Sequence, residues 1–344
     1  MGLEVNPYQT SSTPYRPTTA PQGGAGWSIG LTPQPLATPD TYNASDPRQV
    51  MLATAQQGIS QGLIGQNQLS ILQNDLNTLT PGQLNSLQGL LGQATQPVEQ
   101  VFILKAFAAG EPWNNIVDYA NQIRGQQAQT IIAGSTVTSS HDLIQQWQDA
   151  CAPTVVQTAA AEMDPRYAWT LHHSGNASSI DPYGSDQAIA AQQQQWLQQY
   201  GGVAVPRGQS GGTGIALGTL LNAQLGPIIH ASYSTQEVSD PNQAVNQIAQ
   251  NINQGFDVPL RISWNPPNAG ADDGHFVLAI GAKGTPGNYQ IEIHDPWTGQ
   301  TNWVSQQGIA SNSFSPIFNT YARLSYYYPA TPGAAAPIPS PSYA

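Results

Sequence analysis

The sequence predicts an α+β protein in which a helical region precedes a mostly antiparallel sheet. Apolar residues recur at helical spacing through residues 46–125, and residues typical of helix starts and stops punctuate this stretch. Short runs rich in β-branched and aromatic residues gather instead after residue 226, which is the pattern of strands. With 344 residues, the chain is long enough for two modest domains or one large one.

A flexible arm and a helical module are expected in the first half of the chain. Residues 1–45 are rich in Pro, Thr, Ser and Gly and show little periodic apolarity, as in segments that do not fold alone. Asp46 before a proline is an N-cap pattern, and Thr80 with Gln83 is a capping box. Pro97 and Pro112 open two further helices. The boundaries that follow are 1–45 for the arm, 46–125 for the helical module and 126–140 for a linker.

The second half of the chain combines helices and strands. Helices are expected at residues 151–163, 185–200, 214–225 and 240–254, and strands at residues 227–233, 258–264, 276–280, 289–293 and 321–327. The segment after residue 328 is rich in Ala and Pro. We therefore assign residues 141–328 to one α+β domain and residues 329–344 to a frayed tail.

Composition and charge exclude several classes of function. Nine Lys and Arg oppose twenty Asp and Glu, which gives a net charge of −11 and a pI near 4.6. Such a chain lacks the clustered cations that bind nucleic acid or an anionic membrane surface. It has neither an apolar stretch of about 18 residues, the minimum for a membrane span, nor the apolar core of a Sec signal peptide. Its 41 glutamines and few charges favour a secreted protein, by a route that the sequence does not show.

The chain contains a single cysteine, Cys151. One cysteine excludes an intrachain disulfide and a cysteine-built zinc site, and we expect neither a metal nor a cofactor. Pro153 fits the first turn of a helix that begins at Cys151, where free N–H groups and partial positive charge favour a thiolate and can hold an oxyanion. A Gln five or six residues upstream, best Gln145, could supply a second oxyanion donor. The alternative is a buried cysteine acting as a small hydrophobic residue.

A predicted hairpin brings a histidine and a carboxylate together. His275 precedes one apolar strand, and Asp295 follows the return strand. If Ala282 pairs with Tyr289 across the turn, His275 lies opposite the residue after Asp295. A nucleophile, a base and a carboxylate that orients the base form a catalytic triad. His294 is a weaker candidate base, because strand alternation turns it to the face opposite Asp295.

Together these residues resemble the papain-like cysteine peptidases, and within them the bacterial domains related to bacteriocin-leader-processing (double-glycine) peptidases. Those domains have a Gln about six residues before a Cys that opens a helix, a Gly-x-Pro-Val type strand, a His before a hydrophobic strand, and an Asp-Pro about twenty residues later. The matching residues here are Gln145, Cys151, Gly255-Phe256-Asp257-Val258-Pro259, Gly274-His275-Phe276-Val277-Leu278 and Asp295-Pro296-Trp297-Thr298-Gly299. The resemblance covers about residues 141–328. Ala152 replaces the usual Gly, and Gln146 and Gln148 compete with Gln145.

The resemblance implies a papain-like fold and a thiol hydrolase with Cys151 as nucleophile, His275 as base, Asp295 as orienting residue and Gln145 as oxyanion donor. The expected substrate is a protein or peptide cleaved at a peptide bond, which fits a secreted bacterial effector or toxin. Glutamine deamidation, transglutamination and cell-wall peptide amidase chemistry use the same machinery and stay open. So does a non-enzymatic binding or structural protein with a buried cysteine. The helical module either docks substrate at the catalytic domain or masks its cleft, or it serves as an interaction or secretion module.

Other conspicuous side chains are expected to have structural roles. His172 and His173 are adjacent in sequence, so they point apart and make a poor metal site. His230 lies in the predicted strand 227–233 and is expected to be a core residue. Trp297 either lines the cleft or packs in the core.

Overall fold

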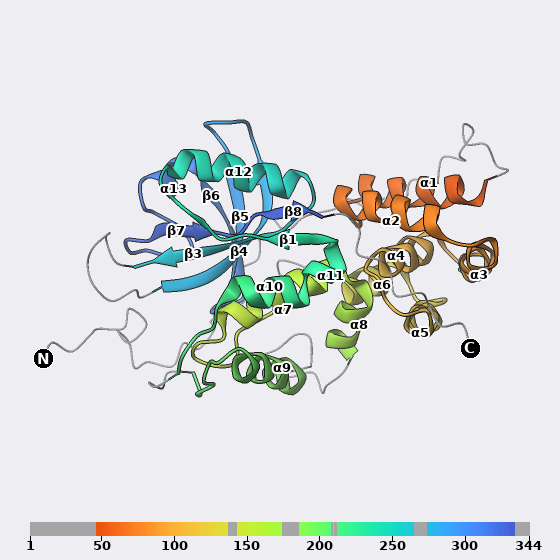
Figure 1. Ribbon diagram of the computed structural model, residues 1–344, viewed down its shortest axis with the longest axis horizontal. Helices are drawn as coiled ribbons and strands as arrows, with labels where there is room; N and C mark the ends of the chain where they lie inside the picture. Colours follow the sequence, from red (N-terminus) through yellow and green to blue (C-terminus); the bar gives the residue numbers. More distant parts are fainter. Residues whose placement is uncertain are drawn as a thin grey trace, which may run out of the picture. The chain divides into compact units, whose positions relative to one another are not determined.

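The computed structural model describes residues 46–136, 143–173, 186–207, 209, 212–264 and 274–333 (Figure 1). The expected arm at residues 1–45 lies outside these described residues, as does the tail beyond residue 333. Within the described part, the predicted α+β class is confirmed, with helices first in the chain and antiparallel strands after them. None of the helices in this part has the length and apolar character needed to cross a bilayer.

The helical module consists of the first six helices of the described chain. They are α1 (Pro47–Ser60), α2 (Gln66–Thr78), α3 (Pro81–Leu91), α4 (Pro97–Ala108), α5 (Trp113–Ile123) and α6 (Ala128–Ser135). Thr80 and Gln83 make the predicted capping box at the start of α3. α4 packs against the other five, and its buried residues, including Phe102 and Leu104, lie on all its faces. A helix enclosed by others requires this all-round apolarity.

Seven further helices lie in the rest of the described chain. They are α7 (Cys151–Met163), α8 (Pro165–His173), α9 (Asp186–Gln199), α10 (Leu217–Gln224), α11 (Gly226–Ile229), α12 (Pro241–Asn253) and α13 (Gln306–Ala310). α7 is buried along nearly its whole length and packs against α8, α10 and the strand β4 (Gly274–Lys283). Its alanines and threonines allow these neighbours to approach closely.

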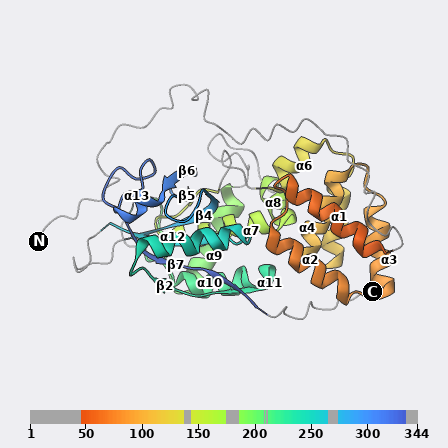
Figure 2. The ribbon, with the colours of Figure 1, turned by 90° about the horizontal axis from the view of Figure 1, so that it is seen from above.

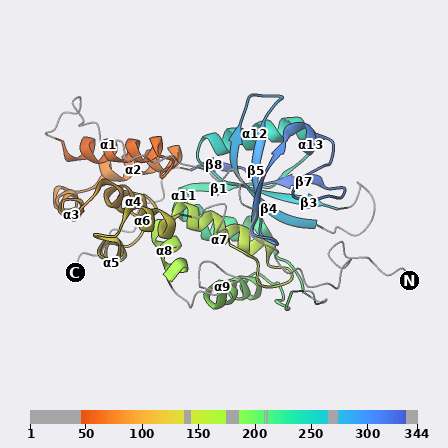
Figure 3. The same cartoon turned by 180° about the vertical axis from the view of Figure 1, so that it is seen from behind.

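A six-stranded antiparallel sheet has the strand order β2-β7-β3-β4-β5-β6. Its strands are β2 (Gln236–Glu237), β3 (Val258–Ser263), β4 (Gly274–Lys283), β5 (Gln290–Asp295), β6 (Gln300–Ser305) and β7 (Arg323–Tyr327). Figures 1 and 3 show α12 and α13 on one face of the sheet and α7 and α10 on the other. Neighbouring residues of β4 divide between the two cores, since Val277 packs with α12 and Leu278 with α7. This alternation fixes which face each β4 side chain serves.

Three sequence-based predictions need correction. The predicted linker at residues 126–140 contains α6, because Ile131 is buried in the core of the helical module. The predicted strand at residues 227–233 begins as α11 and becomes β1 (Ala231–Tyr233) only after His230. The predicted tail contains β8 (Ala330–Pro332), which pairs with β1. In each segment, tertiary contacts override a weak local preference.

The helical module joins the rest of the described chain mainly through α8 and the end of α7 (Figure 2). Trp169 of α8 is part of the helical core, and Gln68 Nε2 donates to the Met163 carbonyl at 2.7 Å. Lys105 of α4 is buried, where its charge interacts with Glu162, Asp164 and Asp257. The described residues of both parts belong to one compact unit.

Candidate active site

Cys151 is the first residue of α7, as predicted from Pro153. The Thr154 N–H already donates to the Ala150 carbonyl at 2.9 Å, and Pro153 has no N–H. The N–H groups of Cys151 and Ala152 are therefore the donors that a helix start leaves without an intrahelical acceptor. Ala152 is almost fully buried and Cys151 is partly exposed. The helix thus presents a thiol and two backbone donors at an accessible end.

His275 is the second residue of β4, paired with Ile262 of β3. Its side chain is buried. The Trp264 ring lies nearly parallel to the imidazole at 6.5 Å, and the Phe318 ring meets it edge-on at 6.1 Å. Trp264 and Phe318 also contact each other, with ring centroids 4.8 Å apart. This aromatic wall shields the imidazole from water and restricts its rotation.

Asp295 ends β5 and is 1% exposed. Its Oδ1 lies 2.7 Å from His275 Nε2 and accepts the Trp297 N–H at 3.0 Å. The Thr298 hydroxyl donates to Oδ2 at 2.8 Å. Burial alone would raise the pKa of Asp295, but the hydrogen bond and charge of His275, with the Thr298 and Trp297 donors, hold it below its usual value. Asp295 is therefore an ionised carboxylate with fixed orientation.

A β-bulge brings His275 and Asp295 to the same face of the sheet. At the hairpin tip Ala282 pairs with Ile291, not with Tyr289 as predicted, and the register shifts by one residue between Ala279 and Gly281. After the shift Leu278 pairs with His294. Continuing this register places Asp295 across from Val277, so Asp295 is the diagonal neighbour of His275.

The Cys151 side chain forms a hydrogen bond with His275. Because Nε2 of the ring is bonded to Asp295, Nδ1 is the nitrogen left for the thiol. Burial would lower the pKa of His275, but the hydrogen bonds and charges of Asp295 and Cys151 raise it to about 10. The structure therefore joins the three predicted triad residues through one imidazole ring.

Gln145 is placed differently from the predicted oxyanion donor. Its side chain is 1% exposed, and Nε2 donates to the carbonyls of Trp147 and Gln148, at 2.8 and 2.6 Å. Both N–H bonds of the amide are thereby used to fold the chain just before Cys151. Gln145 Oε1 has no hydrogen-bond partner among the described residues, and exchanging the two amide atoms would set an oxygen against two carbonyls. The competing Gln146 directs its Nε2 to the Ile144 carbonyl.

The segment before Cys151 is tied to the segment around Asp295. The Gln145 N–H donates to the Pro296 carbonyl at 2.7 Å, and His294 Nε2 donates to the Leu143 carbonyl at 3.1 Å. His294 is fully buried, and strand alternation turns it to the face opposite Asp295, so its bond holds this segment. The helix half and the sheet half of the site are thus joined by backbone hydrogen bonds as well as by the triad.

Several residues beside the triad were not predicted. Thr298 follows Asp295 by three residues, a spacing at which a hydroxyl can bond the carboxylate. Trp264 and Phe318 gave no sequence signal, because their proximity to His275 arises from distant segments. Trp297, which the sequence left either lining the cleft or packed in the core, is half-buried, with the Arg207 guanidinium 4.2 Å above its ring and donating to its carbonyl. Arg207 and Trp297 therefore form one wall beside Asp295.

The remaining histidines lie elsewhere. His173 stacks on Trp169 at 4.1 Å, while the ring of His172 lies 6.4 Å from that of His173, so the pair does not converge on one point. His230 is half-buried and caps the end of α11, where its backbone has a left-handed conformation with φ 49°. The expectation of a core His230 in a strand was therefore wrong.

Comparison of the chain with protein-family models, curated proteins and solved structures finds no match.

Proposed function

We propose that this chain is a thiol hydrolase of papain-like architecture, with Cys151 as nucleophile, His275 as general base and acid, and Asp295 as orienting residue. One observation carries the proposal. A single buried imidazole is bonded to an ionised carboxylate at 2.7 Å and to the only cysteine of the chain. A buried histidine with a purely structural role needs only one of these two hydrogen-bond partners. A histidine that activates a thiol needs both the carboxylate and the cysteine.

The reaction that fits this arrangement is acyl transfer through a covalent intermediate. The raised pKa of His275 lets the ring hold the proton taken from Cys151 before substrate arrives, and the sulfur attacks the substrate carbonyl carbon to form a tetrahedral oxyanion. The oxyanion is held by the N–H groups of Cys151 and Ala152. His275 then gives its proton to the leaving amine as the carbon–nitrogen bond breaks. Water, deprotonated by the same ring, attacks the thioester and releases the acid and the free thiol.

The architecture supports the papain-like assignment. In papain-like enzymes, as in this chain, a helix that begins with the nucleophilic cysteine packs against an antiparallel sheet. That sheet carries the histidine and its partner. Gln145 departs from the expected pattern, because its amide folds the preceding loop. We therefore assign the oxyanion to the backbone donors of α7 and give Gln145 a positioning role.

A peptide bond is the proposed target. Deamidation and transglutamination share the acyl-enzyme and differ only in the amide attacked and the group that accepts the acyl chain. The helical module fits a docking role better than a masking one. Its contacts through Gln68 and Lys105 reach the Met163 end of α7, and 13 helical residues separate that end from Cys151 by about 18 Å.

The test is alkylation of Cys151 by iodoacetamide in the full-length chain, followed by intact-mass spectrometry. Wild type is expected to react at pH 6–7 at least about tenfold faster than His275→Ala, because only the wild type has the base. His173→Ala is the matched control and should react like wild type, since His173 contacts Trp169 and not the thiol. Equal, slow rates in wild type and His275→Ala would refute the Cys–His pair and favour a structural cysteine.

A second measurement identifies the bond attacked. The protein is incubated with a proteome-derived peptide library, with Cys151→Ala as the blank. New peptide termini indicate peptidase activity, a gain of about one dalton at Gln indicates deamidation, and coupling to an added amine indicates transglutamination. Absence of all three, with a reactive thiol, would restrict the reaction to non-peptide amides.

A further inference from the structure

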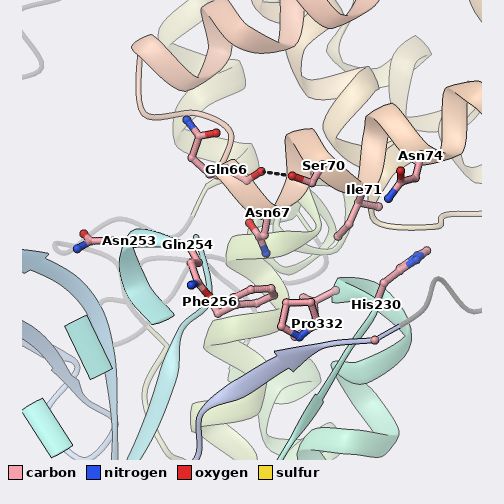
Figure 4. Close-up of a pocket in the computed structure, with 12 residues that line it drawn as sticks. Gln66, Asn67, Ser70, Ile71, Asn74, His230, Asn253, Gln254, Phe256 and Pro332 are labelled. Carbon is pink, nitrogen blue, oxygen red and sulfur yellow. Dashed lines mark hydrogen bonds between the residues drawn. The ribbon is translucent and has the colours of Figure 1, made fainter. Parts of the chain in front are cut away.

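A cavity lies between the helical module and the α+β domain. It has a volume of about 410 Å³ and is bounded by α2, by the end of α12 and the turn after it, and by α11 and the end of β8 (Figure 4). This size is within the usual range for small-molecule sites, about 300–1,000 Å³. Such sites occur preferentially where two packed units meet.

The lining of this cavity is uncharged. Among its described residues there is no carboxylate, lysine or arginine, and the only titratable side chain is His230. Burial lowers the pKa of His230, which keeps its imidazole neutral near pH 7. A charged ligand would enter this space without a counter-charge, at a large cost in desolvation. The cavity therefore selects a neutral ligand.

One wall offers hydrogen bonds of both kinds. Gln66, Asn67, Asn74, Asn253 and Gln254 contribute carboxamides, and Ser70 contributes a hydroxyl. Each of these groups can both donate and accept. A ligand that matches them must itself carry several groups of dual character at close spacing.

Asn67 has a buried side-chain donor without an acceptor. The residue is 7% exposed, and its Oδ1 accepts the N–H of Gln68 at 2.8 Å. Its Nδ2 is buried and has no hydrogen-bond partner among the described residues. Figure 4 shows this nitrogen directed toward Phe256 across the cavity. A buried donor without an acceptor destabilises the protein, and a ligand oxygen would supply the missing acceptor.

The opposite wall is apolar. Figure 4 shows Phe256 and Pro332 side by side across from Gln66 and Ser70. Ile229 also lines the cavity, whereas Ile71 lies on α2 beside Ser70. A matching ligand has a hydrogen-bonding edge and an apolar face. A sugar ring has this build, because its hydroxyls point outward along the ring edge while its C–H bonds cover the ring faces.

We infer that this cavity binds a neutral saccharide, with the sugar hydroxyls on the carboxamide wall and a ring face on Phe256 and Pro332. A peptide is the less suitable occupant, because its carbonyls and N–H groups lie along an extended chain and not around a compact ring. The inference does not depend on the proposed thiol chemistry, since none of the residues that line the cavity belongs to the triad.

The test is binding of three neutral trisaccharides, cellotriose, maltotriose and N,N′,N″-triacetylchitotriose, to the full-length chain by saturation-transfer NMR and titration calorimetry. At least one is expected to bind with a Kd of about 1 mM or tighter. Asn74→Trp should weaken that binding at least tenfold, because Asn74 is an exposed residue at the rim and an indole there fills the cavity. Asn77→Trp, also exposed on α2 but outside the lining, is the matched control and should bind like wild type.

Two further arms make the result decisive. Cys151→Ala should bind the saccharide unchanged, which separates this site from the proposed active site. A capped tripeptide, N-acetyl-Ala-Gln-Ala-amide, should not compete. The inference is overturned if no trisaccharide binds, if the tripeptide displaces it, or if Asn74→Trp binds like wild type while retaining the wild-type melting temperature.

Discussion

His275 and Asp295 are joined by a 2.7 Å hydrogen bond between Nε2 and Oδ1, although they are diagonal neighbours and not direct partners in the hairpin. Because Nε2 is bonded to Asp295, Nδ1 is the ring nitrogen left for Cys151.

Asp295→Asn tests the role of the carboxylate. The amide keeps the shape of the side chain but loses the charge that supports a protonated His275, and its N–H₂ can face the ring. Turnover on whichever peptide substrate the library identifies is expected to fall by roughly 10²–10⁴-fold. Asp118→Asn, on an exposed position of α5, is the matched control and should leave the rate unchanged. A loss below threefold would remove Asp295 from the catalytic machinery.

The raised pKa of His275 makes part of the stability depend on pH. The folded protein holds this proton up to a pKa of about 10, whereas an unfolded histidine loses it near 6.5. The folded state therefore binds more protons between these values, and its advantage is full below about pH 6.5 and declines as the pH rises toward 10. The difference in melting temperature between wild type and His275→Gln, measured from pH 6 to 10, should shrink across this window. A difference that grows with pH contradicts the assignment.

Lys105 is predicted to stabilise the contact between the helical module and α7. Its burial lowers its pKa, and the charges of Glu162, Asp164 and Asp257 oppose that change, leaving it at about 8. Lys105→Met removes the one cation from this buried acidic group and should lower the free energy of unfolding by about 3–5 kcal/mol at pH 7. Urea denaturation measures this change.

The control for Lys105 is Lys283→Met. Lys283 is exposed and lies 3.7 Å from the centre of the Trp303 ring, so its loss should lower the free energy of unfolding by about 0.5–1 kcal/mol. Equal effects of the two substitutions would show that the buried charges are not coupled.

The contribution of Lys105 to stability also depends on pH. Between pH 8 and about 10.4 the unfolded chain binds more protons at Lys105 than the folded chain, so this contribution becomes more favourable as the pH rises through that range.

Gln145→Leu distinguishes a positioning role from oxyanion binding. Loss of the bonds to the Trp147 and Gln148 carbonyls should lower the unfolding free energy by about 1–3 kcal/mol. It should also slow alkylation of Cys151, because the loop before α7 loses its support. An oxyanion donor behaves otherwise: its removal lowers turnover and leaves alkylation intact, since alkylation forms no oxyanion. Measuring both rates on one preparation decides between these roles.

Local signals in the sequence were sufficient for much of the fold. The start of α7 at Cys151 follows from Pro153, the start of α12 from Asp240 and Pro241, and the capping box of α3 from Thr80 and Gln83. These features depend on contacts within one helical turn. Segments without such contacts were predicted poorly, as α6, α11 and β8 illustrate, because distant residues decide their conformation.

Local sequence identifies the candidate triad residues, because one cysteine lies at a helix start, and a histidine and an aspartate lie at the open end of one hairpin. Whether the three meet depends on the tertiary packing. In the predicted register, His275 would share its face with His294 and not with Asp295. In the structure Ala282 pairs with Ile291 at the hairpin tip, and a bulge lies between Ala279 and Gly281. Together these put His275 on the same face as Asp295. Side chains alternate along a strand with a period of two, so a shift of one residue exchanges the two faces, and local sequence does not fix where that shift occurs.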